Sequence, residues 1–115
     1  MSRVEIVTRD GVCPSYLYRP AGSGPWPAVL VFMDGLGIRP AMLEVGGRLA
    51  GNGYFVQHLC PTRRPSSGRA GGDHTIETYP ARHGWVLRDT PAYSAAAAER
   101  PWQTLSALLD ATLKA

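Results

Sequence analysis

The sequence predicts one small α/β domain over residues 1–115, with a short, mostly parallel sheet, an N-terminal β-hairpin and flanking helices. Two strand-like segments stand on either side of Asp10-Gly11. An uninterrupted apolar run fills 28–33, and a stretch with helical spacing separates it from a second strand-like run at 54–59. A strand, helix, strand order predicts parallel pairing through a right-handed crossover.

The hairpin follows from the residues around position 10. Val4–Thr8 alternates between apolar and polar residues as a half-buried strand does, Asp10-Gly11 is a two-residue turn signal, and Ser15–Arg19 can return antiparallel. A loop rich in Gly and Pro follows at 21–27. The apolar run 28–33 is typical of a strand buried on both faces, which makes it the best candidate for a central strand.

The first helix is expected to begin at Pro40, a residue that suits the first helical turn because it needs no N–H partner there. Met42, Val45 and Leu49 recur at helical spacing, and the glycines that follow end the helix. Near the C-terminus, Ser94 can cap a second helix. Because Pro101 lacks an N–H, a kink or restart is expected near Arg100.

The second helix carries one broad apolar face that would cover the sheet. This face comprises Trp102, Leu105, Leu108, Leu109 and Leu113.

Composition favours a soluble globular protein, with 44% hydrophobic and 18% charged residues. No apolar run approaches the roughly 18 residues needed to cross a bilayer, and the first residues show no secretory signal pattern, so no membrane contact and a cytoplasmic location are expected. The net charge is +3, but only Arg63, Arg64 and Arg69 cluster, among Pro, Ser and Gly, so no nucleic-acid partner is expected. Cys13 and Cys60 have no metal-ligand spacing, and neither a metal nor another cofactor is expected.

Four segments together resemble the dienelactone hydrolase family. They are Tyr16-Leu17-Tyr18-Arg19-Pro20, the strand and turn from Pro27 to Gly35, Asn52-Gly53-Tyr54-Phe55-Val56, and the run from His74 through Pro80-Ala81-Arg82-His83-Gly84-Trp85. The resemblance implies a partial α/β-hydrolase fold, with 1–59 as its N-terminal part and 74–115 as its C-terminal part. It is continuous to Val56 and fails from Gln57 onward, and 60–73 reads as a linker in place of the middle of the fold.

The same resemblance implies hydrolysis of a small-molecule ester or lactone by a Cys or Ser nucleophile, a histidine and an aspartate. It places the histidine at His83, which follows a late strand at 74–79, and the oxyanion pocket at Asp34 and Gly35. Arg82 and Arg88 could meet a substrate carboxylate, and Asp89 is close enough in sequence to orient His83.

The nucleophile and its acid partner are missing from this pattern. No Gly-x-Cys-x-Gly or Gly-x-Ser-x-Gly occurs in the sequence, and Cys60 is the only improvised nucleophile worth considering. The chain can therefore be an impaired hydrolase, an inactive remnant that binds a small molecule or a protein, or a fragment without function that self-associates through an exposed sheet edge. Residues 57–72 can equally be a native loop, a deletion scar or a frame-disrupted segment.

Overall fold

The computed structural model describes residues 1–9, 11–34, 36–59, 80–81 and 83–114. In chain order the elements are β1 (Ser2–Thr8), β2 (Gly11–Tyr18), β3 (Ala28–Phe32), α1 (Pro40–Gly51), β4 (Phe55–Leu59) and α2 (Ala95–Leu113). The linker at 60–73 and the late strand at 74–79 lie outside the described residues, so the division of the chain around them stays a prediction.

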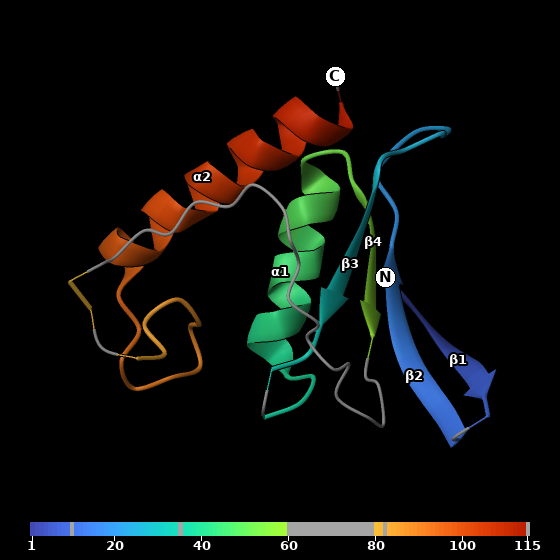
Figure 1. Cartoon of the computed structure of the whole chain (residues 1–115), viewed down its shortest axis with the longest axis horizontal. Coiled ribbons are helices and arrows are strands. Elements are labelled where there is room, and N and C mark those ends of the chain that lie inside the picture. The colour runs from blue at the N-terminus through green and yellow to red at the C-terminus, as the bar shows by residue number, and fades with distance from the viewer. Residues whose placement is uncertain (10, 35, 60–79, 82, 115) are drawn as a thin grey trace, which may run out of the picture.

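The sheet confirms the α/β class and the N-terminal hairpin, but it is mixed rather than mostly parallel. Its strand order is β1-β2-β4-β3 (Figure 1). Among the described strands, β1 with β2 and β2 with β4 are antiparallel, and only β3 with β4 is parallel. The prediction missed this because the hairpin docks directly on β4, through pairs such as Tyr16 with His58 and Tyr18 with Val56.

The prediction that 28–33 forms a central strand is wrong for the described sheet, in which β4 is central and β3 lies at an edge. One face of β3 packs towards α1 through Val29 and Val31, whereas Leu30 and Phe32 on the other face are 57% and 49% exposed. A continuous apolar run indicates a strand suited to burial, but it does not say how many neighbours that strand has.

Helix α1 packs closely on the sheet and begins with Pro40 at its first turn, as predicted. Its residues Ala41, Met42, Gly46 and Leu49 are buried. A Cβ atom built on Gly46 would lie 2.6 Å from Nε2 of His58 and 2.7 Å from Cε2 of Tyr18. Real Cβ atoms do not approach other atoms so closely, so the absence of a side chain at Gly46 allows this helix-to-sheet distance.

His58 lies in that contact with 0% of its surface exposed. Within the part of the chain that the structure describes, neither ring nitrogen has a hydrogen-bond partner. The ring meets Tyr18 edge-on at a centroid distance of 5.8 Å. Burial lowers the pKa of His58, so the neutral imidazole is favoured here as a packing group.

Helix α2 is capped as predicted, since the Ser94 hydroxyl accepts a hydrogen bond from the Ala97 N–H at 3.3 Å. Of the expected kink or restart near Arg100, the restart is wrong, because one helix runs through Pro101, and the kink stays a prediction. Contacts to α1 flank the proline on both sides: Glu99 pairs with Arg48 at 2.9 Å, and the Arg48 guanidinium lies 4.0 Å from the Trp102 ring centroid. These contacts hold the helix against α1 on both sides of Pro101, which cannot donate a backbone hydrogen bond.

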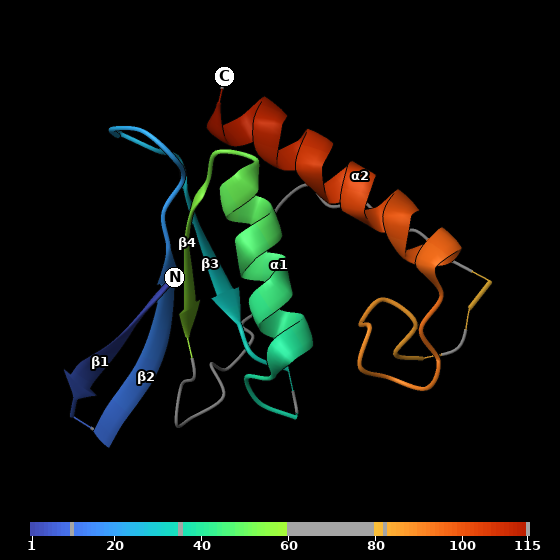
Figure 2. The same ribbon diagram turned by 180° about the vertical axis from the view of Figure 1, so that it is seen from behind.

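Both helices lie on the same side of the sheet, with α1 between the strands and α2 (Figures 1 and 2). The predicted cover of the sheet by α2 is therefore wrong, because α2 covers α1 instead. Trp102 and Leu109 are half-buried against the core, whereas Leu108 is 59% exposed. The Tyr54 hydroxyl also donates a 2.5 Å hydrogen bond to Asp110. Burial and the Asp110 carboxylate raise the pKa of Tyr54, so the hydroxyl keeps its proton.

Substitution at Gly46 tests the close packing of α1. We expect Gly46→Ala to lower the free energy of unfolding by about 1–3 kcal/mol, because the new methyl group must displace His58 or Tyr18. Gly47→Ala is the matched control: its Cβ would lie 3.9 Å from Tyr18, and alanine favours the helix. Urea denaturation of both variants is the measurement. Equal stabilities for the two variants would contradict the packing described here.

Candidate functional site

Asp34 organises the turn that follows β3. Its Oδ1 accepts a 2.9 Å hydrogen bond from the Leu36 N–H, and its carbonyl oxygen accepts one from the Gly37 N–H at 3.2 Å. Gly37 has φ of 86°, a left-handed conformation that glycine adopts without a Cβ penalty. Gly35, the predicted oxyanion residue, lies outside the described residues. Two N–H groups of the turn thus already have acceptors within it.

Arg39 joins this turn to the segment that carries His83. Its Nη1 lies 2.7 Å from Oδ2 of Asp34, and its Nε lies 2.8 Å from Oδ2 of Asp89. Only 17% of the Arg39 side chain is exposed, against 35% for Asp34 and 29% for Asp89. One guanidinium thus pairs with two half-buried carboxylates and reduces the repulsion between them.

The segment after His83 is a compact series of turns. The Thr90 hydroxyl donates to the carbonyl oxygens of Gly84 and Leu87, and the Ser94 N–H donates to the Trp85 carbonyl at 3.0 Å. His83 itself is exposed. Among the described residues, no hydrogen bond to its imidazole is present, and the nearby acid Asp89 is paired with Arg39 instead. The described geometry holds the loop in place without joining His83 to a carboxylate.

The other predicted site residues are placed only in part. Arg82 and Cys60 lie outside the described residues, so their roles stay predictions. Arg88 Nε lies 3.9 Å from Oε2 of Glu44, and both side chains are well exposed. Its predicted contact with a substrate carboxylate is untested.

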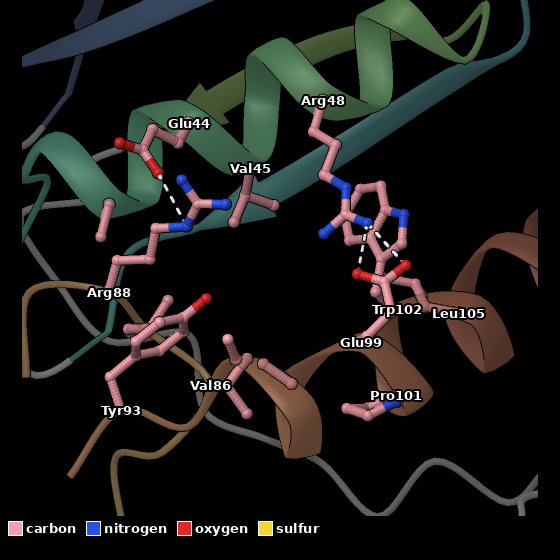
Figure 3. Close-up of a pocket in the computed structure, with 14 residues that line it drawn as sticks. Glu44, Val45, Arg48, Val86, Arg88, Tyr93, Glu99, Pro101, Trp102 and Leu105 are labelled. Carbon is pink, nitrogen blue, oxygen red and sulfur yellow. Dashed lines mark hydrogen bonds and ion pairs between the residues drawn. The ribbon is translucent and has the colours of Figure 1, made fainter.

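A cavity of about 580 Å³ lies between α1, α2 and the segment that contains Val86, Arg88 and Tyr93 (Figure 3). On α1, Ala41, Val45 and Arg48 line it from one helical stripe, beside the stripe that faces the sheet. Sequence reasoning missed this cavity. The sequence of α1 contained a signal for it. Apolar and long side chains occupy a wider part of the helix surface than packing against the sheet alone requires.

The described residues show no metal or membrane feature. No three His, Cys, Asp or Glu side chains among them come together as a group able to hold a metal ion. Neither described helix combines the length and the hydropathy that a membrane crossing needs. The cytoplasmic location stays a prediction.

Comparison with known proteins identifies the first half of this arrangement. Residues 13–62, which contain most of β2 and all of β3, α1 and β4, match the model of the dienelactone hydrolase family. Through this segment, the chain is similar to the dienelactone hydrolase family. A protein of Methylorubrum extorquens named "Putative carboxymethylenebutenolidase" is 42% identical over 53 residues, which are 46% of this chain and 18% of that protein. No solved structure matches the chain significantly.

The extent of the match refines the sequence analysis. The family resemblance was expected to fail from Gln57 onward, but the match continues to residue 62 and so includes Cys60. Asp34, Gly35 and Arg39 also lie within it. His83, Arg88 and Asp89 lie beyond it, so the assignment of His83 as the family histidine rests on its sequence motif.

Replacing Arg39 tests the link between the turn and the His83 segment. We expect Arg39→Met to lower the free energy of unfolding by about 1–3 kcal/mol, because Asp34 and Asp89 lose their shared cation while remaining half-buried. Arg3→Met is the matched control. Its pair with Glu5 is about 60% exposed, and its loss should change stability by less than about 0.5 kcal/mol. Urea denaturation measures both, and an effect of Arg39→Met as small as that of the control would contradict a structural role for Arg39.

Proposed function

We propose that this chain is a dienelactone hydrolase-like protein in which the family activity, hydrolysis of carboxylic ester or lactone bonds, is impaired. The family match at residues 13–62 supports the hydrolase class. The observation that carries the impairment is the absence of a Gly-x-Cys-x-Gly or Gly-x-Ser-x-Gly elbow from the sequence. The chain spans less than a fifth of the length of the curated relative that it matches, so that relative's whole activity is not carried over.

The chemistry explains why the missing elbow matters. In acyl transfer, a thiol or hydroxyl attacks the carbonyl carbon while a histidine removes its proton and then returns it to the leaving alcohol. Water then cleaves the acyl-enzyme. A histidine without a nucleophile has no proton to remove, and a histidine without a carboxylate partner lacks its orienting group. His83 has no such carboxylate among the described residues, since Asp89 pairs with Arg39.

Anion stabilisation at the strand-end turn is the part of the reaction that this segment could support. An oxyanion pocket needs N–H groups that are free to donate to the developing charge. Leu36 and Gly37 donate to Asp34, which leaves Gly35 as the proposed donor. Cys60 is the candidate for an improvised nucleophile, but Pro61 beside it has no N–H to contribute, so we expect no working nucleophile at this position.

Hydrolysis of p-nitrophenyl acetate tests the proposal. We expect the purified chain to hydrolyse this ester at the buffer rate, and Cys60→Ala and His83→Ala to leave the rate unchanged, because no complete triad is formed. Cys13→Ala controls for a generally reactive thiol, since Cys13 is buried in β2. Turnover above background that both Cys60→Ala and His83→Ala abolish, but Cys13→Ala does not, would overturn the impairment and establish a Cys–His site.

We further propose that the chain self-associates through the β3 edge of the sheet. No described strand pairs with that edge, and its outer face exposes Leu30 and Phe32. Unpaired apolar edge strands add strands from other chains readily.

Size-exclusion chromatography with light scattering tests this association. We expect the unmodified chain to elute as a dimer or larger species and Leu30→Lys to shift it towards the monomer, since a charge on an edge strand opposes pairing. Leu36→Lys is the control: Leu36 is 77% exposed but lies in the turn outside the strands. A monomeric unmodified chain, or equal effects of the two lysines, would contradict association through β3.

A further inference from the structure

We propose that the cavity between α1 and α2 binds a neutral, apolar small molecule about the size of a substituted naphthalene. Its volume of about 580 Å³ falls within the range of roughly 300–1,000 Å³ that small-molecule sites occupy. Such a role needs neither the nucleophile nor His83, so it is independent of the proposed hydrolase chemistry.

The walls of the cavity are mainly apolar. One helical stripe of α2 faces one stripe of α1, and the 86–93 segment adds Val86 from the side (Figure 3). The principal apolar contacts would come from Val45, Val86, Ala98, Pro101, Trp102 and Leu105. Burying an apolar ligand against these side chains removes apolar surface from water, which is the main source of affinity in such a site.

The charges around the cavity favour a neutral ligand. Arg48 already has an acidic partner: its Nη2 lies 3.0 and 2.9 Å from the two carboxylate oxygens of Glu99, and its guanidinium lies over the Trp102 ring. Arg88 faces Glu44 across the opening at 3.9 Å. Each of these two arginines thus has a carboxylate beside it, and their four charges sum to zero. An anionic ligand would have to displace a carboxylate that is already present, and would be repelled by it.

One polar group can orient the ligand. In Figure 3 the Tyr93 hydroxyl points into the space between the two helices, below Val45 and Arg88. It can donate a hydrogen bond to a carbonyl or ether oxygen of a neutral molecule. The geometry thus points to an aryl ketone or ether rather than an aryl carboxylate.

Fluorescence titration with N-phenyl-1-naphthylamine, a neutral apolar dye, tests the site on the intact chain. We expect saturable binding with a dissociation constant on the order of 100 µM or tighter, together with quenching of tryptophan fluorescence because Trp102 lines the cavity. The ketone 2-acetonaphthone should displace the dye. The carboxylate 2-naphthoate should compete at least about tenfold less well, because its charge faces Glu44 and Glu99.

Two matched variants locate the binding. Ala98→Phe places a ring in the cavity and should weaken dye binding at least about tenfold, whereas Ala96→Phe adds the same ring to an exposed position of α2 outside the lining and should leave binding unchanged. Absence of saturable binding, or equal effects of the two phenylalanines, would overturn the site. Competition by 2-naphthoate as strong as that by the ketone would overturn the neutral ligand and favour Arg88 as an anion anchor. Neither the dye nor the ketone contains an ester bond, so the result does not depend on hydrolysis.

Discussion

The rest of the structure depends on how closely α1 approaches the sheet. Gly46 permits this approach, because any side chain there would meet the buried rings of His58 and Tyr18. The same contact explains how a histidine comes to lie in the core without a described hydrogen-bond partner: its ring fills space between a strand and a helix. Burying an imidazole without hydrogen bonds costs free energy, and the apolar contacts of the neighbouring core residues Tyr18, Leu49 and Val56 offset that cost.

Side-chain contacts, most of them polar, join the two halves of the chain, whereas backbone pairing holds the strands of the sheet together. Arg39 with Asp89, Arg48 with Glu99, and Tyr54 with Asp110 connect 80–114 to α1 and its flanks. Trp102 and Leu109 add apolar contact, but no residue of α2 is fully buried. Exposed ion pairs contribute little to stability, so the well-shielded Arg39 carries more of this link than Arg48 does. A cavity can persist between α1 and α2 because polar contacts, rather than close packing, set their separation.

Local signals predicted local structure well. Pro40 predicted the start of α1, Ser94 predicted the cap of α2, and the two strand-like segments around residue 10 form the predicted hairpin. The strand order was not predictable in the same way, because an apolar run like that of β3 is compatible with both a central and an edge position in a sheet. The Arg39 bridge was also missed, since its partners lie 5 and 50 positions away in the sequence and only the folded chain brings them together.

The turn after β3 shows why likeness to the family need not carry the family activity with it. The matched segment builds the scaffold of strands and α1, and Asp34 belongs to that scaffold by its contacts: Leu36 donates to its carboxylate, and Arg39 neutralises it. The N–H groups of Leu36 and Gly37 already donate to Asp34, so they are unavailable to an oxyanion. The contacts of Asp34 hold the end of β3 in position. Catalysis at that position would require a nucleophile and a base from other parts of the protein. The segment that matches the family therefore accounts for β3, α1, β4 and most of β2, and any catalysis at the turn after β3 depends on a nucleophile and a base from outside that turn.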